Sequence, residues 1–324
     1  MSGGGRVLVM GVVLLGACAE AQPPAGDAPG SAVSRTAASL PEGAEAVSLG
    51  GEPLFPPELA PEVLAEREEK LAAAWADYQA HRDDADAIIW LGRRTAYLGL
   101  YRDAIAIFSE GIDKHPEDAR MYRHRGHRHI SVRELERAVS DLEKAAQLIA
   151  GTEDQVEPDG LPNARNIPTS TLQSNIWYHL GLAYYLQGDL DNALRAYREC
   201  EKVSGNADML SATSHWLYMT LRLQGRSDEA REVLKPITAE LDIIENDSYH
   251  QLLLMYKGER TPEELIRSAT AGTGLENATL GYGVGNYLAY NGRQDEADAV
   301  LAKVLEGAQW AAFGYIAAEA DRAR

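Results

Sequence analysis

The sequence has little of what β-rich, disulfide-stabilised or nucleic-acid-binding proteins need. It contains two Cys and three Phe among 324 residues, and long stretches show no alternation of Val, Ile and Thr. Few cysteines limit disulfide formation, and the missing alternation argues against strands. The formal net charge of −18 leaves no large basic face for a nucleic-acid backbone. Abundant Ala and Leu, within 45% hydrophobic residues, instead predict an all-α protein with a sizeable core.

Motifs of common catalytic sites are also missing. No GxGxxG joins a strand to a helix, and neither GxSxG nor HExxH occurs. His124 and His127 share a helix face, but His129 falls five residues after His124, on roughly the opposite side. We therefore predict no enzyme activity, no cofactor and no metal, although a site using His124 and His179 from two helices stays geometrically possible.

The N-terminus carries a short apolar segment. Residues 7–15 follow Arg6 and are too few to span a bilayer as a mature helix. They end at Leu15-Gly16-Ala17-Cys18, so residues 1–17 are predicted to be a signal peptide. This order resembles the lipobox of bacterial lipoproteins, which implies acylation of Cys18; the alternative is an ordinary signal peptide with an incidental Cys. By the same resemblance, Ala19 in place of Asp favours the outer membrane over the inner one.

Residues 18–57 are rich in Pro, Gly, Ala and Ser. Such a segment buries too little apolar surface to offset the entropy of ordering, so it is predicted to be a flexible tether. The folded domain is expected to span residues 58–324.

Six marker residues recur through this domain, and most of the intervals between them are close to the number of residues in one helical hairpin. The markers are Gly99, Arg133, Gly188, Gly225, Gly258 and Gly292. The last three intervals are 37, 33 and 34 residues, and an Ala stands five residues after every marker except Gly258. A glycine supplies the positive φ that ends one helix, and the Ala lets the next helix cross closely. Pro236 should interrupt the fourth unit, while Thr261-Pro262-Glu263-Glu264 should start a helix in the degenerate fifth unit.

The third unit resembles the tetratricopeptide repeat (TPR). The residues that match that repeat are Trp177, Leu180, Gly181, Tyr184, Gly188, Leu190, Ala193 and Tyr197. The resemblance implies a right-handed solenoid of about six helical hairpins with flanking N- and C-terminal helices. The layout is similar to bacterial TPR lipoproteins of the NlpI type, which implies a periplasm-facing, lipid-anchored adaptor in the cell envelope that binds a protein or peptide.

The interval between Arg133 and Gly188 exceeds a repeat by 21 residues, and the excess falls at residues 151–171. Pro, Gly and Asn in this segment prevent a helix, so it should form a loop on one face of the solenoid. The sequence does not decide whether this loop is a tolerated variation in length or has a function.

A basic stretch contrasts with the acidic chain. Residues 119–133 hold five Arg and three His with no acidic residue. In TPR register, Arg125 and His129 take packing positions, where they either extend to water or meet acidic partners such as Asp141 or Glu143. The residues predicted to line the concave groove are Arg93, Arg120, Arg123, His124, His127, Asn175, Tyr178, His179 and Tyr185.

Because Arg pairs bidentately with carboxylates, this groove would suit an acidic peptide or a C-terminal carboxylate. The alternative for the Arg set is a solvated helix face with intramolecular ion pairs. An alternative function is a periplasmic protein that binds a small ligand or metal through the row Trp90, His124, His179 and Trp216.

Overall fold

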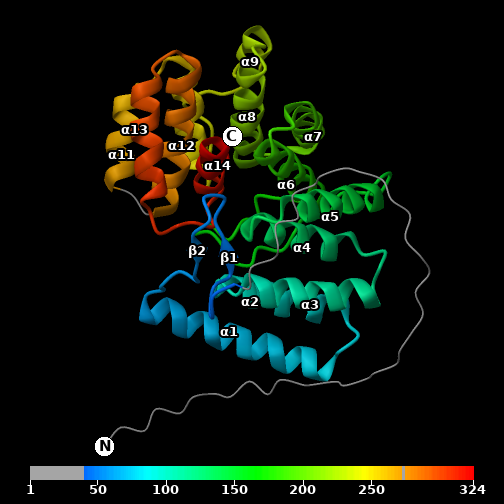
Figure 1. Ribbon diagram of the computed structural model, residues 1–324. Coiled ribbons are helices and arrows are strands. Elements are labelled where there is room, and N and C mark those ends of the chain that lie inside the picture. Colours follow the sequence, from blue (N-terminus) through cyan, green and yellow to red (C-terminus); the bar gives the residue numbers. More distant parts are fainter. Residues whose placement is uncertain (1–39, 272–273) are drawn as a thin grey trace, which may run out of the picture. The chain divides into compact units, whose positions relative to one another are not determined.

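The computed structural model describes residues 40–271 and 274–324, and in this part the chain is almost entirely helical (Figure 1). The prediction of an all-α protein is confirmed. The helices are α1 (Pro61–Ala80), α2 (Ala85–Tyr97), α3 (Tyr101–Lys114), α4 (Ala119–Ser131), α5 (Leu135–Leu148), α6 (Leu172–Gln187), α7 (Leu190–Val203), α8 (Ala207–Leu223), α9 (Ser227–Val233), α10 (Asp247–Lys257), α11 (Pro262–Ala271), α12 (Gly274–Tyr290), α13 (Gln294–Leu305) and α14 (Phe313–Ala323).

The helices from α2 to α13 form the six consecutive pairs that the repeat pattern predicts. Each pair packs together, and each second helix also contacts the first helix of the following pair over most of the chain. α1 precedes the first pair and α14 follows the last (Figure 1). α9 is short and ends three residues before Pro236, as expected from the missing backbone N–H of proline.

The marker residues explain where the first helix of each pair ends. All six have positive φ: Gly99, Arg133, Gly188, Gly225, Gly258 and Gly292. A left-handed residue terminates a helix and turns the chain. The alanines five residues later are fully buried in all five units that have them: Ala104, Ala138, Ala193, Ala230 and Ala297. Small side chains there let the paired helices approach closely.

Part of the predicted tether is folded. β1 (Ala46–Val47) and β2 (Pro53–Leu54) form an antiparallel hairpin in which Ala46 faces Leu54. Both residues are buried with side chains of α2 and α3, and Trp310 Nε1 donates to Phe55 O over 2.6 Å. The expectation of a flexible segment is therefore wrong for residues 44–57, because its few apolar residues join the core of the first unit. The signal peptide (1–17) and residues 18–39 of the tether, Cys18 included, lie outside the described residues.

α14 does more than cover the last pair. It packs on α12 and α13 and also reaches α6, three pairs earlier in the chain. Residues 149–171 connect α5 to α6 without a helix, and a β-bridge joins Val156 to Thr171 at the end of this connection. Between residues 40 and 271 and from 274 to 324, no helix is long and apolar enough to cross a membrane.

Candidate functional site

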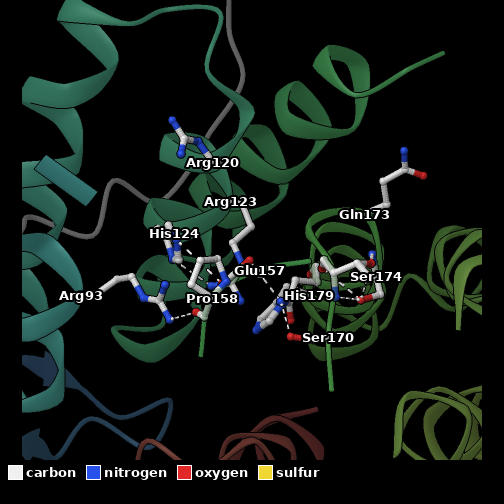
Figure 2. A network of polar contacts seen from close by, with 12 residues as sticks. Arg93, Arg120, Arg123, His124, Glu157, Pro158, Ser170, Gln173, Ser174 and His179 are labelled. Atoms are coloured by element: carbon white, nitrogen blue, oxygen red, sulfur yellow. Dashed lines mark hydrogen bonds and ion pairs between the residues drawn. The ribbon is translucent and has the colours of Figure 1, made fainter. Parts of the chain in front are cut away.

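The basic stretch lies on α4, and two of its residues meet a carboxylate from the chain's own insertion. The Arg123 Nε atom is 3.1 Å from Glu157 Oε2, and His124 Nε2 is 3.9 Å from Glu157 Oε1. From α6, Asn175 Nδ2 donates to Glu157 Oε2 over 3.1 Å. Figure 2 shows Glu157 between these helices. The Glu157 side chain is only 10% exposed, so this is a desolvated ion pair and not a surface contact.

The backbone of the insertion is held on both sides of Glu157. Arg93 Nη2, from α2, donates to Pro158 O over 2.8 Å (Figure 2). Arg94 Nη1, also from α2, donates to Gly160 O over 2.8 Å. Guanidinium groups bind carbonyl oxygens through fixed donors, so these contacts fix the position of the segment. The Glu157 N–H also donates to Ser170 O over 3.2 Å. The insertion is thus bound as an extended acidic segment.

Its far half is tied to the connection between α9 and α10. Arg165 forms a two-pronged ion pair with Asp242, at 2.7 and 3.0 Å. Asn163 and Thr169 both donate to Glu245, and Asn206 Nδ2 donates to Thr169 O over 2.8 Å. Polar contacts therefore hold both halves of the insertion.

The histidines of the site are neutral. Burial, followed by the neighbouring guanidinium groups, holds the pKa of His124 and His127 well below the ordinary value, and burial does the same for the pKa of His179. Arg123 Nη1 lies 2.9 Å from His124 Nδ1, and since an arginine can only donate, this nitrogen must be the unprotonated acceptor. At neutral pH the positive charge of the site therefore belongs to arginine alone.

The structure decides between the two interpretations of Arg125 and His129. Arg125 makes two hydrogen bonds of 2.7 Å to Asp141, and His129 lies between Asp141 and Glu134, at 3.6 and 3.0 Å. Both side chains meet acidic partners from α5 or the turn before it. Asp141 was among the partners expected, whereas Glu143 accepts from Tyr184 instead.

The predicted groove residues do not form a single set. Arg93, Arg123, His124 and Asn175 come together on the insertion. Arg120 sits at the rim, where it pairs with Asp86 and Asp118. His127 and His179 pack against each other, with ring centroids 4.3 Å apart, and Phe313 of α14 lies against both.

Tyr178 and Tyr185 belong to a separate buried network. The Tyr178 hydroxyl accepts from Trp216 Nε1 over 2.8 Å and bonds to Tyr249. The Tyr185 hydroxyl is 2.7 Å from that of Tyr282, and both accept from Asn286. These tyrosines build the core between α6, α8 and α12 and do not face a groove.

The expectation of an open groove is accordingly corrected for most of its residues. The buried ones are Arg93, Arg123, His124, Asn175, Tyr178, His179 and Tyr185. The insertion covers the arginines and Asn175, and α14 covers His127 and His179. The position of each residue within the repeat predicted which side chains face inward. It did not predict that the insertion and α14 cover them.

The predicted row of Trp90, His124, His179 and Trp216 is not continuous. His124 stacks on Phe108, and the Trp90 ring lies under Arg93, 4.4 Å from its guanidinium carbon. Across the described residues, no group of three or more His, Cys, Asp or Glu side chains could hold a metal ion. The metal-binding alternative therefore has no set of ligands in this part of the chain.

Sequence reasoning missed Glu157, Arg94, Arg128 and Phe313. Glu157 stands in the insertion immediately before a proline, and the only signal for it is complementary charge between this acidic loop and the basic helix α4, one helix earlier in the chain. Arg94 follows Arg93 on the same turn, while Arg128 lies four residues after His124 on the same face. Phe313 gives no local signal because its contacts come from a helix more than 130 residues away.

Comparison with known proteins identifies one of the repeats. Residues 174–207, which contain most of α6 and all of α7, match the family model of the tetratricopeptide repeat. The predicted tetratricopeptide repeat is thereby confirmed for this helix pair. No curated protein sequence matches the chain.

Solved structures with a similar fold include other repeat proteins. A crystal structure of MamA is 16% identical over 61% of this chain and 95% of that chain, with a TM-score of 0.42. YrrB, described as a TPR protein with an unusual peptide-binding site, is 15% identical over 73% and 92%, with a TM-score of 0.42. A thermophilic TPR protein from Thermus thermophilus is 19% identical over 69% and 91%, with a TM-score of 0.38.

Proposed function

We propose that the chain, whose residues 174–207 match the tetratricopeptide repeat, is a non-catalytic adaptor that binds an acidic segment of a partner protein. Stacked repeats contact mainly their neighbours and so build extended surfaces suited to protein partners. The proposed site is the inward-facing set Arg93, Arg94, Arg123 and Asn175, which the insertion occupies in this structure.

The observation that carries the proposal is the way the insertion is bound. A buried carboxylate is held by Arg123 and Asn175, and the carbonyls that follow it are held by Arg93 and Arg94. This is the chemistry that recognises an extended acidic peptide: one side chain anchored by charge and the adjoining backbone held by fixed donors. We infer that residues 155–160 stand in for the partner and compete with it.

Displacement of the insertion should cost little apolar burial. Its large apolar side chains already face solvent: Val156, Leu161 and Ile167 are 64%, 47% and 44% exposed. The contacts that a partner must replace are therefore polar. An acidic segment can replace them in kind, whereas a neutral segment would leave Arg123 buried without a charge partner.

Anisotropy of a fluorescently labelled, glutamate-rich peptide tests the proposal. Glu157→Gln keeps the shape of the insertion but removes its charge, so the competitor weakens and the peptide should bind about tenfold more tightly. Arg123→Gln should abolish binding. Arg137→Gln is the matched control, because Arg137 is 71% exposed on α5 and its ion pair is with Glu134, away from the insertion. Unchanged affinity in Glu157→Gln, or an equal loss in Arg123→Gln and Arg137→Gln, would contradict the proposal.

We further propose that the N-terminal segment anchors this adaptor to a bacterial membrane, facing the periplasm, with the outer membrane preferred. The support is the order Leu15-Gly16-Ala17-Cys18 after a short apolar run. Radiolabelled palmitate should be incorporated into the wild-type chain and not into Cys18→Ser. Equal labelling of the two, or none in either, would refute lipidation at Cys18.

A further inference from the structure

A small cavity lies beside Glu157, between α2, α4 and the insertion. Its volume is about 120 Å³, enough for several water molecules or one small polyatomic ion. Three arginines line it, Arg93, Arg123 and Arg128, together with His124 and His127. Among its described lining residues, Glu157 is the one acidic side chain.

The charges around this cavity do not balance. Among the residues that line it, three guanidinium groups face one carboxylate, an excess of two positive charges, since the histidines are neutral. The carboxylates of Asp159 and Glu245 line the adjoining pocket and not this cavity. Arg93 donates to neutral oxygens, of Pro158 and Tyr97. The half-buried Arg128 guanidinium lies 5.1 Å from the centre of the Tyr101 ring and makes neither a hydrogen bond nor an ion pair with any side chain that the structure describes. Burying an uncompensated charge is costly, so such a site favours a bound anion.

Unused donors point to the same conclusion. The Arg123 Nε–H lies near Glu157 but makes no aligned hydrogen bond within the described part of the chain. Since His124 Nδ1 accepts from Arg123, its proton is on Nε2, which is 3.9 Å from Glu157, too far for a hydrogen bond. Burial also lowers the pKa of Arg128 to about 10, as expected for a guanidinium without a counter-ion.

We propose that this cavity binds a small tetrahedral oxyanion, with inorganic phosphate as the representative ion, while the insertion stays in place. A doubly charged oxyanion matches the excess charge and accepts from Arg128, Arg123 Nε and His124 Nε2 at once. Phosphate and arginine pair strongly because the planar fork of donors fits the tetrahedral oxygens. This site goes beyond the proposed function, because no partner protein takes part in it.

Isothermal titration of the full chain with sodium phosphate, at constant ionic strength set by sodium chloride, tests the site. Arg128→Met removes the charge but keeps an apolar stem against Tyr101. Arg120→Met is the control, because Arg120 lies on the same helix, pairs with Asp86 and Asp118, and does not line the cavity. Wild type and Arg120→Met should bind one phosphate, and Arg128→Met should bind at least about tenfold more weakly. No saturable binding to the wild type, or equal binding to the two variants, would overturn the inference.

Thermal unfolding gives a second readout that does not depend on the variant being well folded. Phosphate should raise the unfolding midpoint of the wild type more than chloride at equal ionic strength, because ligands of the native state stabilise it. A midpoint that responds equally to both salts would refute the site. Neither assay contains a peptide. A failure of peptide binding would therefore leave the phosphate results unaffected, and a failure of phosphate binding would leave the peptide results unaffected.

Discussion

Arg133 stands where the other repeats have glycine, and its backbone is left-handed, with φ of 64°. A side chain in this region costs about 1–2 kcal/mol, so a compensating role is expected. The Arg133 guanidinium is buried and donates to Glu319 Oε2, at 2.9 Å, and to Trp310 O, at 2.7 Å. It therefore fastens α14 and the segment before it to the turn between α4 and α5.

Two substitutions at this position separate the backbone from the side chain. Arg133→Ala and Arg133→Gly both leave the Glu319 carboxylate buried without its partner, which should lower the free energy of unfolding by about 3–5 kcal/mol. The glycine variant should be the less destabilised by about 1 kcal/mol, because glycine adopts positive φ freely. Urea unfolding monitored by circular dichroism measures both.

A further change checks the cause of the loss. Glu319→Leu in the Arg133→Gly background removes the stranded carboxylate and should restore part of the stability. Equal midpoints for the alanine and glycine variants would show that residue 133 leaves the left-handed conformation. No recovery in the double variant would show that the charge of Glu319 is not the source of the loss.

At the scale of elements, one contact recurs in four helix pairs. A glycine in the first helix meets the side chain sixteen positions later in the second: Gly92 with Phe108, Gly126 with Leu142, Gly181 with Tyr197, and Gly285 with Leu301. A Cβ at any of these glycines would come within 2.7 Å of that side chain. In these four pairs the missing Cβ lets the two helices pack closely. The repeat is visible in the sequence through other residues, the turn markers and the Ala five residues after most of them.

Gly181→Ala tests this close approach in the third pair. The added Cβ would lie 2.6 Å from Tyr197 Cε1, and Tyr197 is fully buried and cannot move aside. Overpacking of a core costs about 1–3 kcal/mol, which outweighs the gain of about 1 kcal/mol in helix propensity. We expect a lower unfolding midpoint in urea. Gly205→Ala, where a Cβ meets open space, should be nearly neutral, and a similar loss in both would contradict the packing argument.

Capping residues predicted the start of a helix in the fifth unit, where the repeat pattern is weak. Thr261 and Glu264 form the reciprocal capping hydrogen bonds that their spacing indicates, and α11 begins at Pro262. The hairpin of β1 and β2 could not be predicted in this way. Its composition is that of a linker, and it folds only because Ala46 and Leu54 find a core made by α2, α3 and Trp310.

At the scale of the whole molecule, the sequence predicts the repeats and misses what occupies their inner side. Periodicity is a local property, so it identified the pairs, the turns and the inward-facing arginines. Glu157 and Phe313 lie in the insertion and in α14. These two segments are not part of the repeat pattern but pack against the repeats. Nothing in the sequence distinguishes Glu157 from the other Asp and Glu residues, which number 49 in all. Its ion pair with Arg123 could therefore be found only in the structure.

The boundaries of the folded part follow from the same contacts. Residues 40–324 form one compact unit, which includes the hairpin that precedes α1. A soluble fragment for binding studies should therefore begin at residue 40 and not at residue 58, where the sequence alone places the boundary.

The central claim is that an acidic partner segment replaces the insertion on the inner side of the repeats. Hydrogen–deuterium exchange of residues 151–171, followed by mass spectrometry with and without the glutamate-rich peptide, tests it most directly. The Glu157 and Leu172 amides donate to Ser170 O and Gln155 O and should be protected in the free protein. Saturating peptide should abolish the protection of Glu157 while the amides within α6 stay protected; an insertion that remains protected with the peptide bound would contradict the account.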